Sequence, residues 1–129
     1  HDGNDYGSTY VEINLTAQHL YFYKGGSLVV QSDFVSGNES KGWSTPAGAY
    51  PLTYKQRNAT LKGENYSTPV SYWMPFNGGI GLHDAYWRSS FGGTIYKTNG
   101  SHGCINLPPA VAKTIYENIS AGTAVLCYH

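Results

Sequence analysis

Charged side chains are scarce in this chain of 129 residues: Asp, Glu, Lys and Arg together make up 12% of it. Lys and Arg number 8 and Asp and Glu also number 8, so neither sign is in excess. Proteins that bind nucleic acids or anionic membranes do so through a surplus of basic residues, which this chain lacks. We therefore expect no nucleic acid among its partners.

Long apolar runs are also missing. No run approaches the roughly 18 residues that a membrane-spanning helix needs. The first residues, His1 to Asp5, show neither the basic nor the apolar region of a signal peptide. We expect residues 1–129 to form a single domain, excised or matured from a longer protein, whose contact with a membrane would come only through a segment absent from this sequence.

Cysteine is rare, and the two copies differ in their surroundings. Cys127 lies in the apolar stretch Ala124–Tyr128, where a cysteine is usually a small buried hydrophobe. Cys104 follows the polar, glycine-rich residues Asn99–Gly103. Two cysteines are too few for a disulfide framework. A single Cys104–Cys127 bond remains open on this evidence, although it would block any chemistry at Cys104.

Aromatic residues are abundant, at 15%, and 12 of them are Tyr. With many Ser, Thr, Asn and Gly, this composition favours strands and turns, and a surface suited to neutral hydrogen-bonding ligands such as peptides or sugars. Alternating apolar residues predict many short strands, and helical spacing predicts one helix, from Pro108-Pro109 to Ala121-Gly122. The polar segment 55–68 predicts a long connection. The predicted strands cover residues 10–15, 20–23, 28–35, 49–54, 70–76, 80–82 and 123–128.

The loop Ser101-His102-Gly103-Cys104 has the features of a nucleophile loop. A cysteine acyl-transfer enzyme needs a thiolate, a base, and backbone N–H groups that stabilise an oxyanion. The flexible backbone at Gly103 allows its own N–H and that of Cys104 to point toward the sulfur. These two amides are the predicted oxyanion hole.

Two histidines are candidate bases. His102, two positions before Cys104, would point to the opposite side of an extended segment. His83 comes from a separate segment, as catalytic partners usually do, and is the predicted base. Ser101 would orient the imidazole through its hydroxyl or its carbonyl, ahead of Asp84, because neighbouring residues diverge on an extended strand.

A zinc site is the alternative interpretation of the same residues. His83, His102 and Cys104 could act as three donors, and His19 is the remaining internal candidate for a fourth ligand. Because the nucleophile pattern accounts for these residues without a further ligand, we expect no metal and no cofactor.

The spaced pattern formed by Gly81-Leu82-His83 and Ser101-His102-Gly103-Cys104-Ile105-Asn106, with His83 placed 21 positions before Cys104, resembles the signature of the L,D-transpeptidase catalytic domain, the YkuD-like family. The resemblance extends to the opening strands, the turn Thr45-Pro46-Ala47-Gly48 and the closing strand. It implies a mainly β, β-sandwich-like domain of mixed sheets with one main helix near the C-terminus.

The resemblance also implies a reaction and its partners. Cys104 would attack a peptidoglycan tetrapeptide stem and release D-Ala, and the amine of a second stem would resolve the thioester to give a 3→3 cross-link. Carbapenem β-lactams would acylate the same cysteine. Such an enzyme works outside the cytoplasmic membrane, in the cell wall or on the membrane's outer face in a bacterium. Six Asn-x-Ser/Thr sequons, several within predicted elements, also favour a bacterial source.

Five further residues are expected to contact the substrate. Asn106, which stands where some members of the family have Arg, can pair with a peptide backbone. Trp73 and Met74 are balanced between the wall of the groove and the core. The full set is His102, Asn106, Trp87, Trp73 and Met74.

Three other functions compete with this prediction. A carboxypeptidase would use water in place of the acceptor amine, and the sequence does not separate the two. A non-catalytic wall-binding module is suggested by the tyrosine-rich composition. A sortase calls for an Arg after the cysteine, and no Arg follows Cys104.

Overall fold

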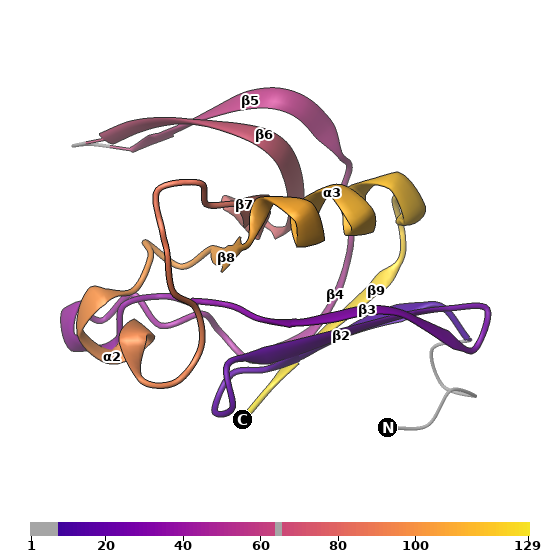
Figure 1. Cartoon of the computed structure of the whole chain (residues 1–129), viewed down its shortest axis with the longest axis horizontal. Coiled ribbons are helices and arrows are strands. Elements are labelled where there is room, and N and C mark those ends of the chain that lie inside the picture. The colour runs from indigo at the N-terminus through magenta and orange to yellow at the C-terminus, as the bar shows by residue number, and fades with distance from the viewer. Residues whose placement is uncertain (1–7, 64–65) are drawn as a thin grey trace.

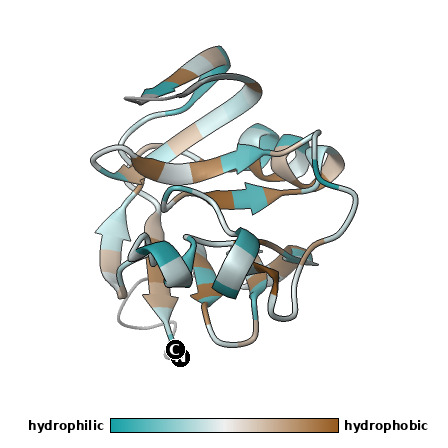
Figure 2. Cartoon of the chain, turned by 90° about the vertical axis from the view of Figure 1, so that its left-hand side faces the viewer, coloured by the Kyte–Doolittle hydropathy of each residue, from teal (hydrophilic) through white to brown (hydrophobic). Residues whose placement is uncertain are grey.

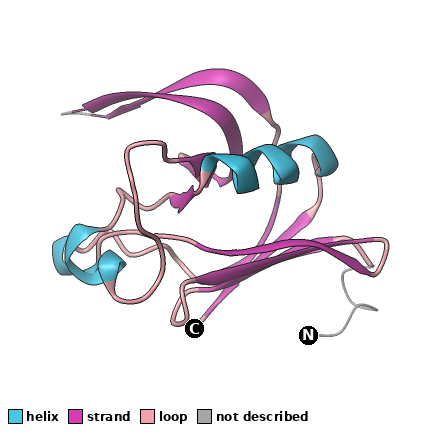
Figure 3. Cartoon of the chain, in the orientation of Figure 1, coloured by secondary structure: helices cyan, strands magenta, loops and turns pink. Residues whose placement is uncertain are grey.

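A computed structural model describes residues 8–63 and 66–129 and shows two β-sheets with one main helix packed at their junction (Figure 1). Strands dominate the architecture, as the colouring by secondary structure makes plain (Figure 3). The elements, in chain order, are β1 Tyr10–Asn14, β2 His19–Lys24, β3 Ser27–Asp33, η1 Glu39–Lys41, β4 Gly48–Pro51, β5 Gln56–Gly63, β6 Tyr66–Asn77, β7 Ile80–Asp84, α2 Ile95–Asn99, β8 Ile105–Leu107, α3 Pro109–Asn118 and β9 Ala124–Tyr128.

The first sheet has five strands in the order β3-β2-β1-β9-β4. Its strands are antiparallel except for β1 and β9, which are parallel neighbours. The first and last strands of the chain therefore lie side by side. These strands were predicted from their alternating apolar residues. The apolar side chains of Val11, Ile13, Leu20 and Phe22 point into the core.

The second sheet has four strands in the order β5-β6-β7-β8, with β7 and β8 parallel and the other neighbours antiparallel. Here the prediction for residues 55–68 was wrong: this segment forms β5 and the start of β6, which pair as a long hairpin. The hairpin projects beyond the rest of the sheet in Figure 1. Much of its length has little core to cover, so polar side chains are tolerated and the apolar alternation that marks a strand is weak.

One hydrophobic core joins both sheets and α3. It includes Phe22 from the first sheet, Met74 and Leu82 from the second, and Ala112 and Ile115 from the helix, all fully buried. The mainly β fold of mixed sheets with one main helix is confirmed.

The main helix begins at Pro109 as predicted, where proline fits the first turn of a helix. It ends at Asn118, earlier than predicted, because Ile119 adopts an extended conformation and its N–H caps the carbonyl of Ile115. Gly122 lies in the turn before β9 instead of ending the helix. Two short helices, η1 and α2, were not predicted from the sequence. Neither has a buried residue, and they are largely teal and white in Figure 2.

Residues 85–104 connect the parallel strands β7 and β8 and include α2. A parallel pair cannot be joined by a tight turn, so a crossover of this kind is required. This crossover carries the loop that ends in Cys104. None of the helices in the described part of the chain is long and apolar enough to cross a membrane.

Candidate active site

Three of the predicted site residues form one row across the second sheet. His83 on β7 pairs in register with Trp73 on β6 and with Asn106 on β8. Neighbouring residues in such a row project from the same face of a sheet. The next row, with Met74, Leu82 and Ile105, faces the core instead. The strand register therefore places His83 and Asn106 together on the face opposite the core.

The loop before β8 is held by the segment that follows β3. Ser101 forms a parallel bridge with Gly37, and its N–H donates to the carbonyl of Ser36 at 2.9 Å. The Thr45 hydroxyl donates to the carbonyl of Gly103 and accepts from the Gly37 N–H. The Thr-Pro-x-Gly turn found in the sequence thus supplies a side chain that anchors the nucleophile loop.

A cavity of about 210 Å³ lies over this row and this loop. It is open to solvent, and side chains from the β5–β6 hairpin, β7, β8 and the crossover contribute to its walls. The lining residues are Leu61, Thr68, His83, Trp87, Arg88, Gly100, Ser101, His102, Cys104 and Asn106.

His83 is 4% exposed and is held through both ring nitrogens. Nδ1 lies 2.7 Å from the backbone carbonyl of Asp84, a contact in which the ring N–H donates. With the Asn106 amide oriented as its neighbours require, oxygen toward Arg88 and nitrogen toward His83, Nε2 accepts from its nitrogen at 3.1 Å. The structure differs here from the expectation that Ser101 orients the ring, because the carbonyl of Asp84, the last residue of β7, is the group that accepts from Nδ1.

Ser101 makes a different set of bonds. Its hydroxyl donates to the carbonyl of Cys104 and accepts from the N–H of Gly103 at 3.1 Å. Gly103 has a φ of +128°, a conformation that disfavours any side chain. In this geometry the Gly103 N–H is turned to Ser101, which differs from the predicted oxyanion hole. Ser101 instead shapes the tight turn that leads into Cys104.

The Cys104 thiol is partly buried beside the row and faces the β6–β7 turn. Its Sγ donates to the carbonyl of Gly79 at 3.4 Å. Burial raises the pKa of the thiol to about 11, and the nearby backbone N–H of Gly81 only partly offsets this rise. The resting thiol is therefore uncharged near neutral pH.

The imidazole of His83 is also uncharged near neutrality. Burial lowers its pKa, opposed by the hydrogen bond to the Asp84 carbonyl and by the Asp84 charge, while the Arg88 charge lowers it further. A neutral imidazole with its proton on Nδ1 has a lone pair on Nε2 that can receive a proton. The cavity thus holds an uncharged thiol and an uncharged imidazole that could receive a proton.

The predicted substrate-contacting residues divide into two groups. Trp87 is 46% exposed and lines the cavity, with its ring centroid 5.9 Å from that of His83. His102 also lines it, stacked on Trp43 at 4.3 Å. Trp73 is buried behind His83, with its Nε1 3.3 Å from the Tyr54 hydroxyl. For Met74 the groove alternative is wrong, because this residue is fully buried in the core.

Three cavity residues escaped sequence reasoning. Leu61 and Thr68 face each other across the β5–β6 hairpin, for which the sequence predicts a long connection. Arg88 lies five positions after His83 and is one of only two arginines in the chain, which was a signal that could have been followed. Its Nη1 donates to the carbonyl of Asn99 at 2.9 Å, so it also ties two parts of the crossover together.

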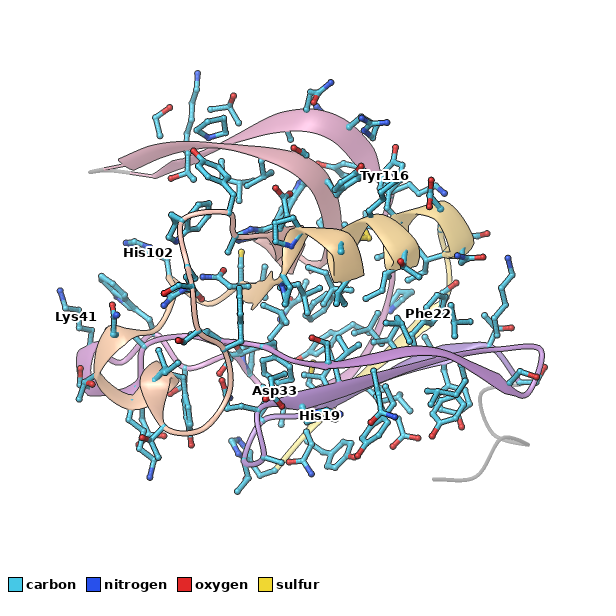
Figure 4. All side chains as sticks on the ribbon, in the orientation of Figure 1. His19, Phe22, Asp33, Lys41, His102 and Tyr116 are labelled. Atoms are coloured by element: carbon cyan, nitrogen blue, oxygen red, sulfur yellow. The ribbon has the colours of Figure 1, made fainter. Side chains whose placement is uncertain are left out.

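The zinc alternative is not supported by the positions of its ligands. His19 lies on β2, where its ring contacts Asp33 at 2.7 Å and Gln31 at 3.0 Å. Figure 4 shows His19 beside Asp33 and well apart from His102. Within residues 8–63 and 66–129, no group of three His, Cys, Asp or Glu residues is arranged to hold a metal ion. Both cysteines are free, so the Cys104–Cys127 bond left open by the sequence is absent.

Comparison with known proteins identifies the family to which this fold belongs. The family model described as the YkuD L,D-transpeptidase catalytic domain matches residues 8–127. The chain belongs to this family. The two mixed sheets and the one main helix are those of the L,D-transpeptidase fold.

Individual L,D-transpeptidases agree with this assignment. A crystal structure of a mutant Enterococcus faecium L,D-transpeptidase is 43% identical with a TM-score of 0.89, over 94% of this chain and 50% of that one. An NMR structure of the E. faecium catalytic domain acylated by ertapenem is 43% identical with a TM-score of 0.83, over 94% of this chain and 97% of that one. The putative L,D-transpeptidase YciB of Bacillus subtilis (strain 168) is 27% identical over 125 residues, or 91% of this chain.

The chain spans 64% of the length of the B. subtilis relative and half of the E. faecium crystal chain. By contrast, it matches nearly the whole of the E. faecium catalytic domain. The resemblance is therefore to the catalytic part of these proteins.

Proposed function

We propose that this domain is a peptidoglycan L,D-transpeptidase that forms 3→3 cross-links through a thioester on Cys104. The observation that carries the proposal is the shared cavity: Cys104, the neutral imidazole of His83 and the amide of Asn106 all line it, and it is open to solvent. Its place of action would be the bacterial cell wall or the outer face of the cytoplasmic membrane, where stem peptides are found.

Acylation begins when the carbonyl of the donor stem's third residue reaches Cys104. The thiol leaves the Gly79 carbonyl and the Asn106 amide releases Nε2 of His83, which takes the thiol proton as Sγ forms a bond to the carbonyl carbon. The oxyanion is stabilised by the Cys104 N–H, joined by the Gly103 N–H once that group has left Ser101. The intermediate then breaks its C–N bond, and the departing D-Ala amine takes the proton from His83.

Deacylation runs through the same groups. The side-chain amine of a second stem attacks the thioester, His83 receives a proton from that amine, and the proton returns to the sulfur as the new amide forms. Asp84 holds the imidazole through its carbonyl in both halves, so that Nε2 stays directed at the cavity. Trp87 and His102, at the cavity walls, would contact the peptide.

A carbapenem places a strained carbonyl where the donor carbonyl would lie. The E. faecium domain acylated by ertapenem supports this part of the proposal, since this chain is 43% identical to it over almost its full length.

Intact-protein mass spectrometry after incubation with ertapenem tests the nucleophile. We expect one adduct on the wild-type protein and none on Cys104→Ala. The matched control is Cys127→Ala, which removes the other thiol from the core and should retain the adduct. A folded wild-type protein without an adduct, or an adduct that persists in Cys104→Ala, would contradict the proposal.

The transferase half needs its own assay. Incubation with a disaccharide-tetrapeptide should give a cross-linked dimer and free D-Ala, measured by mass spectrometry of the products. Release of D-Ala with only monomeric tripeptide would show that water is the acceptor and would overturn the transferase assignment in favour of a carboxypeptidase.

A further inference from the structure

The guanidinium of Arg88 faces the side-chain amide of Asn106, on the side away from His83. Arg88 Nε and Nη2 both donate to the amide oxygen of Asn106, at 2.8 and 3.2 Å. The amide nitrogen of Asn106 then lies 3.1 Å from His83 Nε2. Arg88, Asn106 and His83 therefore form a chain of hydrogen bonds that ends on the proposed base.

Donor and acceptor chemistry permits one direction for this chain. His83 Nδ1 donates to the Asp84 carbonyl, so Nε2 of the neutral ring is an acceptor and needs a donor opposite it. The guanidinium has only donors and needs an acceptor. The Asn106 amide satisfies both with its oxygen toward Arg88 and its nitrogen toward His83. The reverse orientation would set two donors against each other at one end and two acceptors at the other.

A protonated His83 would disturb this arrangement. With protons on both nitrogens, the ring would present Nε2–H to the N–H₂ group of Asn106, and two donors would face each other. Asn106 could relieve this only by rotating, which would turn the same N–H₂ group toward the Arg88 cation. An imidazolium is therefore disfavoured as long as Arg88 holds the amide.

We infer that Arg88 is a positioning residue that keeps His83 neutral by fixing the orientation of the Asn106 amide. This inference rests on the proposed role of His83 as base. It assigns a function to the one permanent cation among the described residues that line the cavity. It also gives Asn106 a role beyond contact with the substrate.

The other ionisable groups near His83 do not cancel this effect of Arg88 on its charge state. The Asp84 carboxylate accepts from the backbone N–H groups of Ser71 and Tyr72, both at 2.9 Å, so its charge is already engaged. Across the cavity lie Cys104 and His102, and β6 contributes the uncharged ring of Trp73. The Arg88 charge acts in the same direction as burial and lowers the pKa of His83.

An NMR titration of the imidazole in the substrate-free protein tests the inference. In Arg88→Met the amide is free to turn, and we expect the pKa of His83 to rise by about one pH unit. Arg88→Lys retains the charge and one donor, so its rise should be smaller. Arg57→Met is the matched control, because the Arg57 guanidinium stacks on Tyr72 at 4.9 Å, outside the cavity lining, and its loss should leave the titration unchanged.

A double variant separates two effects of Arg88 on the pKa of His83: the effect through the Asn106 amide and the direct effect of the Arg88 charge. In an Asn106→Ala background, Arg88→Met should shift the His83 titration by clearly less than it does in the wild-type protein. Equal shifts in the two backgrounds would overturn the role of the amide, as would an unchanged titration in Arg88→Met. Should Arg88→Met fail to fold, Arg88→Lys against Arg57→Lys provides the same comparison.

Kinetics supply a second readout. If His83 must be neutral to act, the acid limb of ertapenem acylation in Arg88→Met should move to higher pH by the same interval as the titration. A raised KM for the peptide donor with an unmoved pH profile would overturn the inference and show that Arg88 grips the substrate. Loss of the proposed function itself would be seen differently, as an adduct that survives Cys104→Ala while the NMR titration behaves as expected.

Discussion

Cys104 and His83 share a cavity but are not paired as ions in the resting protein. The thiol donates to Gly79 and the imidazole nitrogen accepts from Asn106. The pKa of the thiol is raised to about 11 and that of the imidazole is lowered, both chiefly by burial. An uncharged pair is the form that burial favours, because each charge would lose its hydration. Proton transfer is then part of acylation, not a step that precedes it.

This state predicts how Cys104 responds to a simple alkylating agent. Because iodoacetamide reacts with the thiolate, its rate at Cys104 should be slow at pH 7 and rise about tenfold per pH unit over the following units. No plateau is expected below about pH 10, given a thiol pKa of about 11. Mass spectrometry of timed samples measures the rate, with circular dichroism to confirm that the fold persists.

Cys127 provides the control for this labelling experiment, and the shape of the pH profile provides the outcome that would contradict it. Cys127, buried in the core with a pKa raised to about 12, should stay unlabelled in the folded protein, so Cys104→Ala should show almost no labelling. A rate that levels off near pH 7 would mean that the thiolate is already formed, and would contradict the neutral pair.

The sequence predicts Cys104 and His83 as the reacting groups, and the structure brings both to one cavity, but the groups that hold them were not predicted. Cys104 and His83 stand in short motifs whose residue types announce the chemistry. The bonds to the Asp84 carbonyl and the Asn106 amide depend on how the chain turns after β7 and on the register of β8 against β7. These hydrogen bonds arise from tertiary packing and cannot be predicted from the spacing of residues in the sequence. Arg88 was not predicted for the same reason, since it lies on the crossover and its partner Asn106 lies on β8.

At the scale of elements, the β5–β6 hairpin forms one wall of the cavity. Leu61 and Thr68 lie opposite each other on its two strands and both line the cavity. Leu61 also packs with Cys104 against the small cluster of Ala59, Val70 and Trp73. The hairpin was taken for a connection because its polar residues lack a clear period, although backbone pairing alone is enough to make it a strand pair.

Shortening the side chain of Leu61 should widen the cavity at this wall. We expect Leu61→Ala to reduce the second-order rate of ertapenem acylation roughly fivefold, the equivalent of about 1 kcal/mol of lost apolar contact. Stability should change little because Leu61 is only partly buried. Stopped-flow or timed mass spectrometry gives the rate.

The neighbouring Lys62 is the control for this prediction. Successive residues of a strand point to opposite faces, and Lys62 is exposed. Lys62→Ala should acylate at the wild-type rate. If the two variants behaved alike, the contact of Leu61 with the cavity would have no part in acylation.

At the scale of the whole molecule, the last strand completes the first sheet. β9 lies between β1 and β4 and contributes Val125 and Cys127 to the core. The sequence predicted both strands but not their neighbourhood, because parallel pairing of the first and last strands joins residues more than 100 positions apart. The period of the apolar residues predicts which face of each strand is buried. The order of the strands in the sheet depends instead on how the buried faces pack together.

Removal of residues 124–129 should therefore abolish the folded state. The deletion separates β4 from β1 and opens the core on one side, a loss that a domain of this size cannot absorb. Near-ultraviolet circular dichroism would show the loss of fixed aromatic packing. Deletion of His129 alone, whose ring makes one long contact with Thr16, should leave the thermal midpoint nearly unchanged. A cooperative unfolding transition in the longer deletion would contradict this account.

The lining of the cavity is divided between the paired strands β7 and β8 and the crossover that connects them. His83 and Asn106 stand on the paired strands, whereas Trp87, Arg88 and Cys104 stand on the connection itself. Insertions or deletions near Trp87 would reshape the entrance without disturbing the register that aligns the base. The length of one loop could thus change which ligands the cavity admits, while the sheets, the core and the register of His83 with Asn106 stay as they are.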